Sequence, residues 1–115
     1  MVKPRFRDHF REDLIQNLMN RSNQGTIQLY KHHVITEGVM YSCDMCIEFH
    51  NKSDGLLTSA WIEHIAREVA EALKSILPRD MDKSDVEVII EKVNQIMKFP
   101  IENVQEEVDT YYNRL

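Results

Sequence analysis

Two cysteines and the histidines near them are the side chains of this 115-residue chain best suited to metal chemistry. Cys43 and Cys46 form a C-x-x-C pair, and His50 follows four residues later. Upstream, either His33 or its neighbour His32 could supply a fourth ligand. Thiolate sulfur and imidazole nitrogen are the ligands that structural zinc prefers. One interpretation is therefore a zinc-stabilised or zinc-sensing regulatory domain built on these residues.

The segment around the cysteines alternates between apolar and polar residues from Val39 to His50. A period of two is typical of a half-buried strand. Along a strand, an offset of three residues places Cys43 and Cys46 on opposite faces, so they could share a metal only if residues 43–46 formed a turn. We therefore favour structural cysteines, with Cys43 in the core and Cys46 on the more polar face, and we expect no metal or other cofactor.

Two pairs of imidazole and carboxylate could support acid–base chemistry. His9 with Asp13 and His64 with Glu68 are each four residues apart, which places both groups on one face of a helix. The Glu-x-x-His pattern of di-iron bundles and the His-Glu-x-x-His pattern of zinc hydrolases are both missing from the sequence. The three glycines form no phosphate-binding loop. We therefore interpret these pairs as solvated helix faces and expect the protein not to be an enzyme.

The charges are unevenly distributed along the chain. The formal net charge is -5, and residues 80–115 carry nine acids and four bases, whereas residues 1–79 carry ten of each. The chain starts with a basic stretch that could touch phosphate, an acidic partner or the acidic end of a second copy. The acidic balance of the rest makes binding of nucleic acid by the body of the protein unfavourable.

Candidate partner-binding residues lie near both ends of the chain. They are charged or aromatic, and arginine and tyrosine in particular are frequent at binding hot spots. The set is Arg5, Arg7, Arg11, Glu102, Glu106, Glu107, Tyr111 and Tyr112. For one of the two tyrosines we expect core packing instead, because both fall near a heptad-like apolar stripe.

Helices are predicted where apolar residues recur at spacings of three and four. Ser84 and Glu87 predict a capping box at the start of the third helix. The predicted helices cover residues 5–21, 56–77, 85–98 and 100–115.

Two strands are predicted between the first and second helices. Residues 26–36 are rich in β-branched and aromatic residues, and the alternation over residues 39–50 predicts a second strand. Glu37 and Gly38 would connect them as an antiparallel hairpin. We therefore predict one small α+β domain over residues 1–115, in the order helix–strand–strand–helix–helix–helix, with the hairpin covered by helices. Residues 1–6 are a candidate flexible basic arm.

The predicted function is protein–protein interaction without catalysis, as a regulator, inhibitor, adaptor or immunity-type partner. A lone hairpin is marginal in water and leaves two open edges, so we also expect a homodimer. A second alternative is a nucleic-acid-associated protein that uses the basic start. Two cysteines are too few for a disulfide scaffold, and no apolar run approaches the roughly 20 residues that cross a bilayer, so we expect a cytoplasmic protein without membrane contact.

Overall fold

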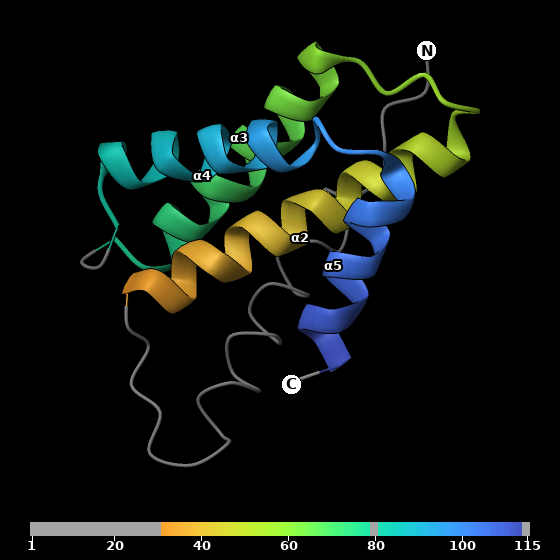
Figure 1. Cartoon of the computed structure of the whole chain (residues 1–115). Helices are drawn as coiled ribbons and strands as arrows, with labels where there is room; N and C mark the ends of the chain where they lie inside the picture. Colours follow the sequence, from red (N-terminus) through yellow and green to blue (C-terminus); the bar gives the residue numbers. More distant parts are fainter. Residues whose placement is uncertain (1–30, 79–80, 114–115) are drawn as a thin grey trace.

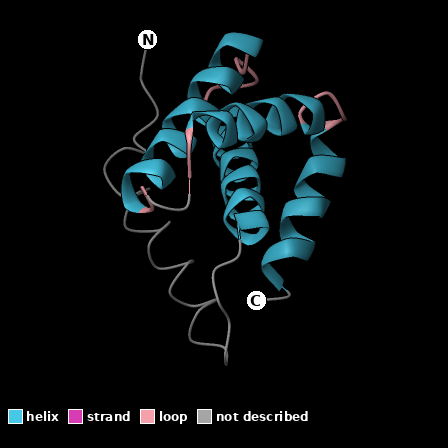
Figure 2. Cartoon of the chain, turned by 90° about the vertical axis from the view of Figure 1, so that its left-hand side faces the viewer, coloured by secondary structure: helices cyan, strands magenta, loops and turns pink. Residues whose placement is uncertain are grey.

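The computed structural model describes residues 31–78 and 81–113, and over these residues the protein forms helices joined by short connections (Figures 1 and 2). Neither of the described ranges contains a strand. The helices are α2 (Lys31–Lys52), α3 (Ser59–Ile76), α4 (Lys83–Ile96) and α5 (Ile101–Asn113).

The predicted hairpin is wrong, and so is the α+β class, because residues 31–52 form the single long helix α2. The alternating residues lie on this helix in two sets of four-residue spacing. Val39, Cys43 and Ile47 make one set, and Tyr41, Met45 and Phe49 make the other. At about 100° per residue the two sets face roughly opposite sides of the helix. In residues 39–50 the alternating pattern therefore comes from a helix that buries two opposite sides.

Helix α2 buries residues in several directions because α3, α4 and α5 all pack against it. A helix that is covered on several sides shows no single apolar stripe, which removes the usual helical signal from its sequence. Gly38, predicted in the hairpin turn, lies inside this helix. A Cβ atom there would come within 2.6 Å of Leu73 Cδ1 and 3.1 Å of Ile89 Cδ1, so glycine lets α2 approach α3 and α4 closely.

The other three predicted helices within the described residues are confirmed with shifted ends. Helix α3 begins after Thr58, whose side chain accepts a hydrogen bond from the backbone N–H of Trp61. Helix α4 has its capping box two residues earlier than predicted. The carboxylate of Asp82 accepts from the N–H groups of Ser84 and Asp85, and Asp85 accepts from the N–H of Asp82. The aspartate cap therefore serves the N–H groups at the start of α4, two residues before those that we expected Ser84 to serve.

The core lies mainly between α2, α3 and α4. One large cluster joins residues of these helices, including Val69, Leu73 and Ile89, to Val104 and Val108 of α5. A smaller cluster of Cys46, Phe49 and Ile65 lies towards the end of α2. The turn after α2 uses positive φ angles at Asp54 and Gly55 to reverse the chain into α3.

Several predictions fall outside the described residues. They are the basic arm over residues 1–6, the helix over residues 5–21 and the first part of the strand over residues 26–36.

Candidate partner-binding face

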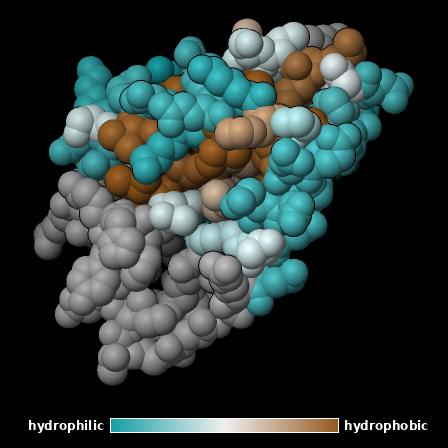
Figure 3. Space-filling model, in the orientation of Figure 1, coloured by the Kyte–Doolittle hydropathy of each residue, from teal (hydrophilic) through white to brown (hydrophobic). Residues whose placement is uncertain are grey.

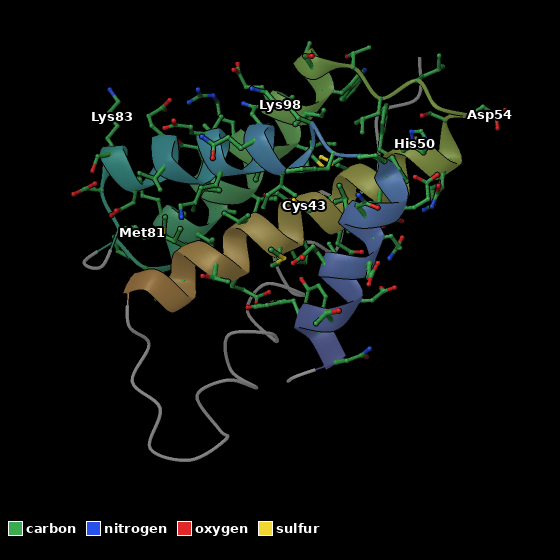
Figure 4. The ribbon with its side chains drawn as sticks, viewed as in Figure 1. Cys43, His50, Asp54, Met81, Lys83 and Lys98 are labelled. Carbon is green, nitrogen blue, oxygen red and sulfur yellow. The ribbon has the colours of Figure 1, made fainter. Side chains whose placement is uncertain are left out.

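The two cysteines lie near the middle of α2, and both are fully buried free thiols. Figure 4 shows Cys43 in the middle of the helix and His50 near its end. On a helix, an offset of three residues brings Cys43 and Cys46 to the same side, so the predicted placement on opposite faces is wrong. The predicted exposure of Cys46 to a polar face is wrong too, because its cluster packs under α3.

The geometry around the thiols differs from that of a zinc knuckle. The zinc interpretation required a turn over residues 43–46, but these residues form part of helix α2. Within the described residues, no group of three or more His, Cys, Asp or Glu side chains could hold a metal. His33 also belongs to α2, but its side chain is outside the described set, while the half-buried His50 lies a full turn beyond Cys46.

Burial keeps both thiols neutral. It raises the pKa of Cys43 to about 12, and the charge of Asp44 adds to the effect. Burial also raises the pKa of Cys46 strongly, with Cys43 contributing. The thiolate is the form that attacks electrophiles and binds metals, so these cysteines behave as small apolar core residues.

The acidic side of α5 gathers the predicted partner-binding glutamates. Glu102, Glu106, Glu107 and Asp109 are all exposed. At about 100° per residue Asp109 shares a side with Glu102 and Glu106, while Glu107 lies at the other edge of the exposed surface. Helix α5 contains no lysine or arginine. Its opposite side buries Val104 and Val108, so the helix is amphipathic, and the charged residues among its exposed ones are all acidic. In Figure 3 the part of the surface formed by α5 is hydrophilic.

Tyr111 and Tyr112 point back into the fold from the last turn of α5. The hydroxyl of Tyr111 donates to Oε1 of Glu37 at 2.8 Å, and the hydroxyl of Tyr112 donates to Oε2 at 3.4 Å. The two rings meet edge to face, with centroids 5.1 Å apart. Both tyrosines are half-buried, and Glu37 is 0% exposed. Glu37 is predicted in the hairpin turn, and no pattern in the sequence marks it as a partner of the two tyrosines.

Carboxylates on α2 continue the acidic side of α5. Burial raises the pKa of Asp44, and the nearby charges of Glu48 and Asp109 raise it further. Asp109 belongs to α5, so negative charge accumulates across the seam between the two helices. Burial raises the pKa of Tyr112 well above its ordinary value, and the charges of Glu37 and Asp44 add to it. The seam is therefore an acidic environment in which a cation would be favoured.

The imidazole–carboxylate pair on α3 is half-buried. Nε2 of His64 lies 3.9 Å from Oε1 of Glu68, too far for a hydrogen bond. The His64 ring instead meets Trp61 edge to face, with centroids 5.5 Å apart. Arg5, Arg7 and Arg11 of the predicted partner-binding set lie outside the described residues, as do His9 and Asp13.

An open groove of about 290 Å³ runs between α2 and α4. Figure 3 shows apolar surface between these two helices. The groove is lined by Ile35, Thr36, Val39, Lys92, Gln95 and Ile96. Among the described residues that line the groove, Lys92 is the one with a charged side chain.

Comparison with known proteins gives no relative: no family model matches the chain, and neither the curated proteins nor the solved structures contain a significant match. Among the described residues, none of the helices combines the length and apolar character needed to cross a membrane.

Proposed function

We propose that the protein works by binding another protein, as a regulator, inhibitor, adaptor or immunity-type partner, and carries out no catalytic step itself. The observation that carries this proposal is the outer side of α5. It presents Glu102, Glu106 and Glu107 to solvent, and the helix has no basic residue to neutralise them. Charges of one sign on an exposed face attract an oppositely charged partner and speed its association.

The partner that fits this face is a protein with a basic surface. The environment of Asp44 supports the choice, because burial raises its pKa most and the like charges of Glu48 and Asp109 at the seam between α2 and α5 raise it further by repulsion. Lysine or arginine side chains of a partner would relieve this repulsion. We further propose a cytoplasmic location, which agrees with two free cysteines in the core. The homodimer stays a prediction, but the open sheet edges that motivated it do not exist in the described residues.

Charge reversal on α5 tests the proposal. We would compare Glu106→Lys/Glu107→Lys with the control Glu63→Lys/Glu71→Lys, which reverses two exposed glutamates on α3 and changes the net charge equally. The wild-type protein, tagged in its own host, would be used to isolate the partner. The affinities of the purified proteins would then be measured at low and high salt.

We expect the α5 variant to bind the partner at least about tenfold more weakly at low salt, with a smaller difference at high salt. The α3 variant should bind like the wild type. Equal losses in both variants would show that net charge alone matters, and an unchanged affinity of the α5 variant would remove this face as the binding site.

A further inference from the structure

Helix α5 is attached to the rest of the described fold differently from the other helices. Helices α2, α3 and α4 each pack against the other two, whereas α5 packs chiefly against α2 (Figure 1). Helix α4 buries five residues, but α5 buries only Val104 and Val108. Local stability follows the amount of buried apolar contact, so α5 is the helix whose docking has the smallest apolar contribution.

Polar contacts also hold the last turn of α5 on α2. The hydroxyls of Tyr111 and Tyr112 donate to the two carboxylate oxygens of Glu37, 74 and 75 residues earlier in the chain. The acceptor is fully buried on α2. Hydrogen bonds to a charged acceptor are stronger than neutral ones, and losing them leaves a buried carboxylate with fewer donors.

Electrostatic repulsion opposes the same docking. Asp44 on α2 and Asp109 on α5 interact unfavourably across the seam, and Glu48 adds negative charge beside Asp44. Asp109 is partly compensated within its own helix, because Nε2 of Gln105 donates to it at 2.9 Å. The docked state of α5 therefore combines two buried valines, one short and one longer hydrogen bond to Glu37, and an acidic seam that opposes them.

We propose that α5 is a releasable helix, locked onto α2 by hydrogen bonds from Tyr111 and Tyr112 to the buried carboxylate of Glu37. When the lock opens, α5 leaves α2 as a unit while α2, α3 and α4 stay folded. Release uncovers the apolar side of α5 around Val104 and Val108 together with the part of α2 beneath it. This inference does not rest on the proposed function, because it concerns the inner side of α5 and not its acidic outer side.

Hydrogen exchange measured by mass spectrometry on the full chain tests this inference. The variants are Tyr111→Phe, Tyr112→Phe and the double change, which keep the rings and remove only the hydroxyls. Ile90→Val on α4 is the control, because it removes a buried methyl group from a helix that packs against α2 and α3 and leaves both hydroxyls in place. Exchange would be followed separately for peptides from α3, α4 and α5.

We expect α5 amides to exchange faster than those of α3 and α4 in the wild-type protein. Tyr111→Phe should raise the α5 rate about fivefold, and Tyr112→Phe should raise it less because its hydrogen bond is longer. The double change should raise it at least about tenfold, with less than about twofold change in α3 and α4. Ile90→Val should instead raise the rates of α3 and α4. Exchange of α5 in step with α3 and α4 in every protein would overturn the release as a unit. Fast α5 exchange that the tyrosine changes leave unaltered would overturn the lock.

Discussion

Helices α2, α3 and α4 form one mutually packed body, whereas α5 is an amphipathic helix laid against α2. Within the body, residues such as Val69, Leu73 and Ile89 are completely buried, and Gly38 allows the backbone of α2 to approach its neighbours. At the α2–α5 seam, two buried valines and a hydrogen bond from Tyr111 to Glu37 hold α5 on α2. Like charges on the two helices oppose this packing. This small protein therefore combines a mutually packed three-helix body with a helix whose docking relies on polar contacts as well as on two buried valines.

The largest effect expected from this comparison concerns the thiols inside the body. With its pKa raised to about 12 from an ordinary 9.0, Cys43 has about 1,000-fold less thiolate at pH 8 than an exposed cysteine. We expect both thiols to react with an aromatic disulfide reagent at least about 1,000-fold more slowly in the native protein than in denaturant, followed by absorbance. Rapid reaction of either native thiol would show that the body of α2, α3 and α4 opens easily. The body would then be no more stable than the docking of α5.

A cavity in the body should lower the stability of every helix in it. Leu73 is fully buried in contact with the main core cluster. Leu73→Ala should therefore reduce the free energy of unfolding by about 3 kcal/mol, measured by chemical denaturation. The control Val88→Ala, at a position exposed on α4, should change it by no more than about 0.5 kcal/mol. A small loss for Leu73→Ala would mean that α2, α3 and α4 are not tightly packed.

A cavity under α5 should have a smaller and more local effect. Val108 is 2% exposed and belongs to the buried side of α5. Val108→Ala removes two methyl groups' worth of burial, so the docking of α5 should weaken by about 2 kcal/mol. Hydrogen exchange should rise in α5 more than in α3 and α4. An equal rise in all three helices would show that α5 unfolds together with α3 and α4.

The smallest effect is expected from removing one charge at the seam. The pKa of Asp44 is raised in the folded state, mainly by burial and then by Glu48 and Asp109. The folded state therefore binds a proton more readily than the unfolded state, and stability falls as pH rises from the ordinary pKa of the group through its folded pKa. At pH values above the folded pKa, the loss of stability caused by the charged Asp44 persists. Asp44→Asn should raise the urea midpoint at pH 7, and its advantage should vanish at acidic pH where both states are protonated.

The exposed loop after α2 offers a matched control for that charge. Asp54→Asn makes the same chemical change at an exposed position outside the seam. Its urea midpoint should stay close to that of the wild type at both pH values. A midpoint for Asp44→Asn that is lower than the wild-type value at pH 7 would contradict the repulsion between α2 and α5.

Much of the helical structure could be predicted from the sequence, but the nature of the central element could not. Single apolar stripes predicted α3, α4 and α5, because each of these helices turns one side towards the core and leaves the other in water. Helix α2 is covered on several sides, and its two buried sets at four-residue spacing imitate the alternation of a strand. Propensity and period alone do not distinguish these cases when the partners of the segment are unknown.

The sequence by itself determined the acidic outer side of α5, since the helix contains four acids and no bases between Ile101 and Asn113. It also determined which residues form α3, α4 and α5, to within a few residues at their ends. Only the tertiary structure decided that the cysteines share one buried side of α2 and that Glu37 receives the hydroxyls of Tyr111 and Tyr112. Charge and local period are properties of neighbouring residues. A contact between residues 74 positions apart exists only once α5 has docked on α2, and no pattern within either segment encodes it.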